Sequence, residues 1–170
     1  ILAYFLLLKK MKESSPGRIV NVSSAAHKFI PRINLKDLQS ENSFKTFVVY
    51  GQSKLANILF TKKLSKLLEK EKLTVNCLHP GWVSTSLGAQ NENISLLPKL
   101  MGFFSPLLAK SSDRGAETSI FLCCSPEVSD VTGEYFANCK IEKTSQGALN
   151  ESDSEKLWDI SLQLTKLNYP

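Results

Sequence analysis

A tyrosine followed four residues later by a lysine is the pair best suited to chemistry in this sequence. Tyr50 and Lys54 lie in a segment with helical periodicity, and a separation of four places both side chains on one helix face. An ammonium close to a phenol favours the phenolate. Such a phenol can give a proton to a carbonyl oxygen or remove one from an alcohol near neutral pH. The pair therefore indicates acid–base chemistry, although this spacing also arises by chance.

Two further polar segments stand at the ends of expected strands. Ser23 and Ser24 end the β-branched run 18–23, and His79-Pro80-Gly81 ends the apolar run 73–79. In open α/β sheets, ligands bind just beyond the carboxyl ends of the strands. A glycine there lets a ligand approach the backbone closely. Taken singly, each segment is better explained as an ordinary strand exit.

The hydrophobic pattern predicts an alternation of helices and strands. Helices are expected over 1–13, 50–71, 112–124 and 151–166, and strands over 18–23, 73–79 and 133–137. Asn150 or Ser152 is the expected cap of the last helix. Residues 25–47 are predicted to form a long loop. This alternation is typical of an α/β fold with a parallel sheet and helices on both faces.

Composition is that of an ordinary globular α/β chain. Of the 170 residues, 42% are hydrophobic and 22% charged, and the net charge is +5. Many lysines fall in amphipathic stretches such as 61–72, which predicts a solvated helix face and no nucleic-acid partner. The four cysteines and two histidines lack metal-ligand spacing, so no metal site is expected. No apolar segment is long enough to span a bilayer.

Together, these motifs resemble the short-chain dehydrogenase/reductase family. A strand ending in Ser-Ser, then Tyr-x-x-x-Lys, then a strand ending in Pro-Gly-x-Val-x-Thr occur in the family's order. The segments 18–27, 53–57, 79–81 and 133–140 are similar to the retinol dehydrogenase branch in particular. That branch more often has aspartate where Asn138 stands.

The resemblance implies a role for each matching residue. Tyr50 would be the general acid/base, and Lys54 would hold the nicotinamide ribose. Ser24, rather than Ser23, aligns with the serine that orients the substrate oxygen. The remaining cofactor-binding positions match the loop that meets the nicotinamide amide and the phosphates: Pro80, Gly81, Val83 and Thr85. His27 and His79 are left outside the predicted site, because a lone histidine is more often structural.

The resemblance also implies a Rossmann-type doubly wound parallel sheet. Residues 1–170 would be the C-terminal part of a single domain, and the N-terminal dinucleotide-binding half would be missing from this chain. The strand 18–23 would then be an unpaired edge. Residues 86–112 would form the substrate lid, whose apolar part suits a lipophilic substrate or a membrane surface. A core-covering helix broken by prolines accounts equally well for that apolar part.

The expected function is NADP(H)-dependent interconversion of retinol and retinal, or of other lipophilic alcohols and aldehydes. NAD(H) stays open, because the residue that separates the two cofactors would lie in the missing half. A homodimer and a cytoplasm-facing location, on the endoplasmic reticulum or mitochondrial membrane through a segment absent here, are further expectations. The alternative is a truncated, catalytically inactive form that acts at most as a binding or dimerising module.

Overall fold

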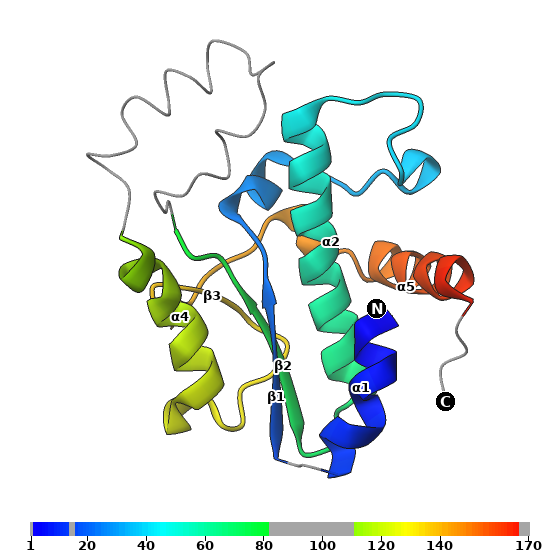
Figure 1. Cartoon of the computed structure of the whole chain (residues 1–170). Coiled ribbons are helices and arrows are strands. Elements are labelled where there is room, and N and C mark those ends of the chain that lie inside the picture. The colour runs from blue at the N-terminus through cyan, green and yellow to red at the C-terminus, as the bar shows by residue number, and fades with distance from the viewer. Residues whose placement is uncertain (1, 14–15, 82–110, 167–170) are drawn as a thin grey trace.

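The computed structural model describes residues 2–13, 16–81 and 111–166, which form a four-stranded sheet with helices on both faces (Figure 1). The elements are α1 (Leu2–Glu13), β1 (Gly17–Val22), α2 (Thr46–Leu67), β2 (Leu73–Leu78), α4 (Ser112–Cys124), β3 (Tyr135–Ala137), β4 (Lys140–Ile141) and α5 (Glu151–Thr165). Helices α1, α2 and α5 lie on one side of the sheet and α4 on the other. The expected α/β, Rossmann-type architecture is confirmed.

The parallel pairing of β1 with β2 places the ends of both strands at one edge of the sheet. Gly17 pairs with Leu73 at one end of the register, and Val22 pairs with Leu78 at the other. Strand β3 is parallel to β2. Because the strands run in the same direction, the residues that follow β1, β2 and β3 emerge side by side. This edge is therefore the position where a ligand site is expected.

Alternating side chains of the strands pack on opposite faces of the sheet. Cys77 of β2 packs with Leu55 of α2 on one face, whereas Leu78 packs with Leu122 of α4 on the other. Strand β3 alternates in the same way. Successive side chains of a strand point to opposite faces of the sheet. Because both faces are covered by helices, side chains in both directions are apolar, and the strands read as continuous apolar runs.

Helix α2 is the longest of the described helices and presents one largely apolar stripe to the sheet. Its fully buried side chains follow the spacing of three and four expected of such a stripe: Leu55, Ile58, Leu59, Thr61 and Leu64. The sequence pattern predicted this face but set the start of the helix at Tyr50. The helix begins at Thr46 instead, so Tyr50 lies in its second turn.

Strand β4 was not predicted, because a hairpin turn rather than periodicity creates it. Asn138 and Cys139 adopt φ values of 50° and 59°, and Ala137 pairs with Lys140 across them in antiparallel register. Positive φ at both central residues is typical of a type I′ turn, for which asparagine is favoured. The expected strand 133–137 is consequently shortened to Tyr135–Ala137 and continued by β4.

Strand β1 lies at the end of the strand order and pairs with β2 alone within the described chain. This agrees with the expected edge position of residues 18–23. The loop that follows β1 contains two 3-10 helices, η1 (Ala25–Phe29) and η2 (Leu35–Asp37). In the same loop, the carboxylate of Asp37 accepts backbone N–H groups from Glu41, Asn42 and Ser43. The loop is thus ordered by local hydrogen bonds.

The ends of α4 and α5 agree closely with the sequence pattern, whereas α2, expected over residues 50–71, spans Thr46–Leu67. Helix α4 begins at Ser112 and is capped by the Ser111 hydroxyl. The side chain of Asn150 caps α5 by accepting the N–H of Asp153, which decides between the two expected caps. Helix α5 ends at Thr165, and Lys166 follows it in the left-handed region.

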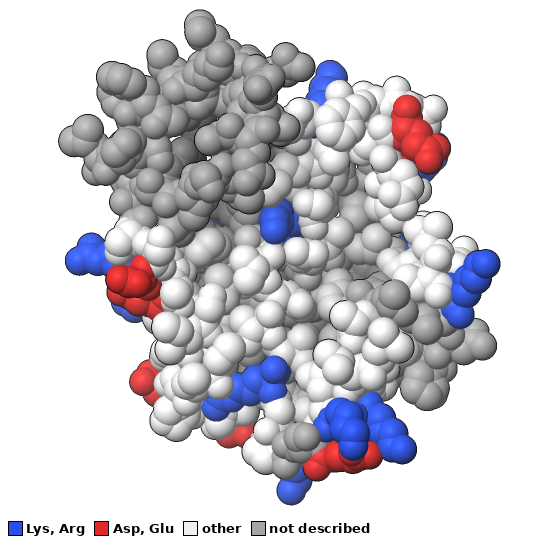
Figure 2. All heavy atoms as spheres, viewed as in Figure 1, with Lys and Arg blue, Asp and Glu red and all other residues white. Residues whose placement is uncertain are grey.

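Basic and acidic side chains are dispersed over the face shown in Figure 2 rather than gathered in one patch. Several lysines pair with glutamates, as Lys12 does with Glu71 and Lys66 with Glu151. Among the described helices, none is long and apolar enough to cross a membrane. The described residues contain no group of three or more metal-ligating side chains.

Candidate active site

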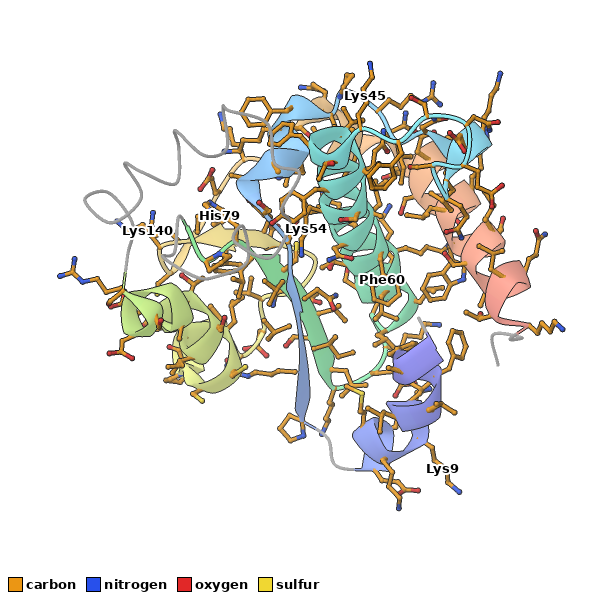
Figure 3. All side chains as sticks on the ribbon, turned by 45° about the horizontal axis from the view of Figure 1, so that its top comes forward. Lys9, Lys45, Lys54, Phe60, His79 and Lys140 are labelled. Carbon is orange, nitrogen blue, oxygen red and sulfur yellow. The ribbon has the colours of Figure 1, made fainter. Side chains whose placement is uncertain are left out.

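The segments after β1 and β2 lie next to each other at the carboxyl edge of the sheet. The N–H of Ser23 donates to the carbonyl of Leu78 at 2.6 Å, and the N–H of His79 donates to Phe136 at 3.0 Å. The serine pair and the Pro80-Gly81 turn therefore share one edge, as predicted from the sequence. Figure 3 shows His79 and Lys54 at this same end of the sheet.

Lys54 links the predicted acid–base pair to the end of β1. Its ammonium lies 5.5 Å from the centre of the Tyr50 ring and donates to the Val22 carbonyl at 3.4 Å. The Asn57 side chain donates to the same carbonyl at 3.0 Å. Tyr50 is 38% exposed, so its side chain is open to a ligand. The expected shared helix face of Tyr50 and Lys54 is thus present in the structure.

Gly51 allows the loop after β1 to approach this turn of α2. A Cβ atom at Gly51 would lie 2.7 Å from Cγ1 of Ile30 and 3.1 Å from the carbonyl oxygen of Ala26. A side chain at this position would therefore displace η1 from the helix. The loop that begins with Ser24 is held against the turn that carries Tyr50 because residue 51 has no side chain.

The two adjacent serines have different environments. Ser23 is buried, and its hydroxyl donates to the carbonyl of Lys54 at 2.7 Å. The hydroxyl of Ser24 accepts the N–H of Ala26 at 3.2 Å as the cap of η1, and its side chain is half-buried. Ser24 therefore retains a hydroxyl proton that a ligand could accept, whereas the Ser23 proton is used inside the fold.

His27 is a fully buried histidine with a partner at each ring nitrogen. Its Nδ1 lies 2.7 Å from the carbonyl of Ser24, and its Nε2 lies 3.3 Å from the backbone N of Ser145. Because a carbonyl can only accept, Nδ1 carries the proton and Nε2 accepts from Ser145. Burial lowers the pKa of His27 from 6.5, outweighing the effect of the bond to Ser24. The histidine is therefore a neutral structural group.

The buried neutral state of His27 predicts a loss of stability in mild acid. In the unfolded chain His27 has its ordinary pKa of about 6.5 and binds a proton below that pH, whereas the lowered pKa in the folded chain disfavours the proton. The free energy of unfolding therefore falls as the pH decreases below about 6.5. The slope from one such group approaches about 1.4 kcal/mol per pH unit. We expect urea unfolding to show this slope in the native chain and a shallower one in His27→Phe.

Two carboxylates that titrate at lower pH than His27 give this experiment its internal control. Lys28 and Arg32 lower the pKa values of Glu142 and Asp153 from 4.5 and 3.8. Stability from these carboxylates is present above their ordinary pKa values and is lost as the pH falls below them. This loss should persist in His27→Phe. Equal slopes in both chains between about pH 6.5 and pH 5 would contradict the assignment.

Some of the predicted site lies outside the described residues. Pro80 and Gly81 are described and follow β2, and Gly81 has a φ of 84°, a left-handed conformation that favours glycine. Val83, Thr85 and residues 86–110 of the expected lid are not in the described ranges. The last two residues assigned to the lid, Ser111 and Ser112, are instead the cap and first residue of α4.

An exposed apolar surface near Tyr50 was not recognised from the sequence. Phe47 lies one turn before Tyr50 and is 57% exposed, and its ring centre is 5.5 Å from that of Phe29. Phe44 and Val48 are also exposed. The spacing of Phe47 and Tyr50 on one helix face could have indicated this surface, but the segment was assigned to a loop.

A groove of about 250 Å³ between α2 and α5 lies apart from these residues. It is lined by polar and aromatic side chains that include Asn57, Phe60 and Trp158. None of the predicted site residues lines it. The candidate site is therefore the carboxyl edge of the sheet, where the predicted groups converge.

The parallel sheet, with the tyrosine–lysine pair and the serine at its carboxyl edge, agrees with the order of motifs by which the sequence resembles the short-chain dehydrogenase/reductase family. The sequence model of the short chain dehydrogenase family matches residues 1–94. The chain therefore belongs to the short-chain dehydrogenase/reductase family.

Curated relatives agree with the expected branch. Retinol dehydrogenase 14 of Mus musculus is 48% identical over 157 residues, which are 92% of this chain and 46% of that protein. Retinol dehydrogenase 12 of Homo sapiens is 38% identical over 165 residues, which are 97% of this chain and 51% of that protein. The resemblance to retinol dehydrogenases is confirmed, and the chain spans about half the length of these relatives.

Solved structures show the same fold. A putative uncharacterised protein from Mycobacterium paratuberculosis superimposes with a TM-score of 0.65 at 27% identity, covering 91% of this chain and 52% of that one. Acetoin dehydrogenase from Enterobacter cloacae superimposes with a TM-score of 0.52 at 23% identity, covering 79% of this chain and 47% of that one. The second similarity concerns the fold alone.

Proposed function

We propose that this chain carries the catalytic groups of an NADP(H)-dependent oxidoreductase that interconverts lipophilic alcohols and aldehydes such as retinol and retinal. The observation that carries the proposal is the position of Lys54, whose ammonium contacts both the Tyr50 ring and the end of β1. This arrangement joins an acid–base group to the edge of the sheet where ligands bind. NADP(H), rather than NAD(H), is proposed on the basis of the relatives' branch.

The residues present fit a nicotinamide nucleotide. Gly81 has no side chain to obstruct a ligand, and the Lys54 ammonium can donate to ribose hydroxyls at the same edge. Pro80, Val83 and Thr85 are the other proposed cofactor contacts. When bound, the nicotinamide supplies or accepts the hydride.

Tyr50 is proposed to exchange the proton that accompanies the reaction. In the reductive direction the phenol donates a proton to the substrate oxygen, and in the oxidative direction the phenolate removes it. The Ser24 hydroxyl donates a hydrogen bond to that oxygen and orients it. Both groups stand at the carboxyl edge, and the close packing at Gly51 keeps their segments together.

The exposed aromatic surface supports a lipophilic substrate. Phe29 and Phe47 present their rings beside the turn that carries Tyr50. An apolar chain or ring lying on them would be removed from water while its terminal oxygen reached the phenol. Membrane-surface association, a cytoplasm-facing location on the endoplasmic reticulum or mitochondrial membrane, and a homodimer belong to the same proposal.

The test is fluorescence titration of the purified chain with NADPH, followed by reduction assays with retinal and with a small polar ketone. Saturable binding in the native chain that is weakened in Lys54→Ala supports the proposal. Lys9→Ala is the matched control, because it removes the same charge from α1, away from Lys54 and His79 (Figure 3). Faster turnover of the polar ketone than of retinal would contradict the lipophilic substrate.

Absence of NADPH binding by a folded, soluble chain would favour the alternative function. The chain would then be a catalytically inactive form whose exposed helices and β1 edge serve binding or dimerisation. Circular dichroism on the same sample establishes whether the chain is folded. Analytical ultracentrifugation would then show whether it forms dimers.

Alanine substitutions of the two adjacent serines should have different effects, and each variant is the control for the other. Ser24→Ala should lower turnover by roughly 10²-fold, as removal of a hydrogen-bond donor to a reacting oxygen does in other enzymes. Ser23→Ala should instead lower the free energy of unfolding by about 1 kcal/mol, because it removes the buried donor to the Lys54 carbonyl. Steady-state kinetics and urea unfolding of both variants separate these effects, and the reverse pattern would contradict the assignment of Ser24.

A further inference from the structure

We propose that His79 and Glu142 position the Pro80–Gly81 turn, with Glu142 fixing the imidazole that holds the backbone of Gly81. The inference rests on the proposed function in one respect only, since the turn is a proposed cofactor contact. The two residues come from distant parts of the sequence and meet at the carboxyl edge of the sheet. Neither belongs to the catalytic groups described above.

The turn is bound directly to the imidazole. The backbone N–H of Gly81 donates to Nδ1 of His79 at 3.1 Å. Gly81 has a φ of 84°, so the backbone reverses at the point where this bond is made. A neutral imidazole accepts at only one nitrogen, and here that nitrogen is Nδ1. The proton of the neutral ring must therefore be on Nε2.

Glu142 faces the nitrogen that carries this proton. Its Oε2 lies 3.5 Å from Nε2 of His79. A carboxylate next to Nε2 favours the tautomer with the proton there, and in that tautomer Nδ1 carries the lone pair that accepts from Gly81. Carboxylates behind metal-binding histidines fix the ring by the same physics. Glu142 therefore acts on the turn through the imidazole.

Glu142 is itself held in an ionised state at a defined position. Its Oε1 forms an ion pair with the ammonium of Lys28 in η1, and this contact lowers the pKa of Glu142. Its backbone N–H donates to the carbonyl of Tyr135 at 2.8 Å, directly after the β4 hairpin. One carboxylate thus connects the loop after Ser24 with the turn after β2.

The plane of the imidazole is restrained by aromatic packing. The ring of Tyr135 stacks on His79 with centres 5.8 Å apart and an interplanar angle of 20°, and it packs in a T-shaped arrangement with His27, with centres 4.9 Å apart. The His79 side chain is largely buried. Because stacking fixes the plane and Glu142 fixes the proton, Nδ1 is presented to Gly81 in one orientation.

Two readouts test the proposal without cofactor. Long-range ¹H–¹⁵N correlation spectra of the native chain above its histidine pKa should show His79 protonated at Nε2. Hydrogen exchange of the Gly81 amide should accelerate by about twofold to tenfold in His79→Phe, which keeps the stacked ring but has no acceptor. His79→Asn places a carbonyl oxygen near the position of Nδ1 and should restore part of the protection.

Glu142→Gln tests the second contact, and Glu155→Gln is its matched control because Glu155 pairs with Lys63 far from His79. Glu142→Gln should populate both tautomers of His79 and accelerate exchange at Gly81, whereas Glu155→Gln should change neither. A proton on Nδ1 in the native chain would overturn the proposal. So would unchanged Gly81 exchange in Glu142→Gln.

NADPH titration of the same variants separates this inference from the proposed function. Weaker binding in Glu142→Gln than in Glu155→Gln, together with the altered exchange, supports both. If no variant and no native sample binds NADPH while the tautomer and exchange effects hold, the proposed function fails and the positioning role stands. Altered NADPH binding with unchanged exchange would contradict positioning through Gly81.

Discussion

Tyr50→Phe should lower the rate of NADPH-dependent aldehyde reduction by about 10²- to 10⁴-fold while leaving cofactor binding close to that of the native chain. The substitution removes the proposed proton donor but keeps the ring over which the Lys54 ammonium lies. The loss should therefore appear in kcat, because a proton transfer made only in the transition state is absent. Steady-state kinetics with a lipophilic aldehyde, beside an NADPH titration, provide the measurement.

The matched control for this prediction is Tyr4→Phe. Tyr4 is buried in α1, where its ring packs on Phe5 and Phe60 away from the carboxyl edge of the sheet. Removing its hydroxyl should leave kcat within a small factor of the native value. If Tyr50→Phe retained native turnover, the acid–base role of Tyr50 would be wrong and another proton donor would be required.

Leu55→Ala should lower the free energy of unfolding by about 2–5 kcal/mol, the range for deleting a buried leucine side chain from a packed core. Leu55 is fully buried and packs with Cys77 of β2, Tyr135 of β3 and Leu157 of α5. It is also adjacent to Lys54, so the contact that stabilises the core holds the site helix against the sheet. Urea unfolding followed by circular dichroism measures the change.

Leu164→Ala is the control, because it makes the same leucine-to-alanine change at an exposed position. Leu164 lies on α5 and is 60% exposed, so its truncation should change stability by no more than about 0.5 kcal/mol. A loss below about 1 kcal/mol in Leu55→Ala would contradict the packing of α2 on the sheet, since a cavity at that position should cost more. In both variants, the dependence of the free energy of unfolding on urea concentration should equal that of the native chain, as expected when the mode of unfolding is unchanged.

Local patterns in the sequence determined most of the elements and the pairing of Tyr50 with Lys54. Spacing of three and four placed the buried face of α2, and a serine followed by Asp113 marked the start of α4. These features depend on residues within a few positions of each other. The alternation of elements and the three motifs together also led to the family that the comparisons confirmed.

Tertiary structure decided which residues are buried, accessible or in contact where the local sequence does not distinguish them. Ser23 and Ser24 are alike in sequence, and only the packing of α2 on β1 buries the first and leaves the second accessible. His79 and Glu142 are far apart along the chain and meet because a hairpin turn with positive φ folds β4 back beside β3. Contacts of this kind depend on where whole elements come together, which no periodicity within one segment encodes.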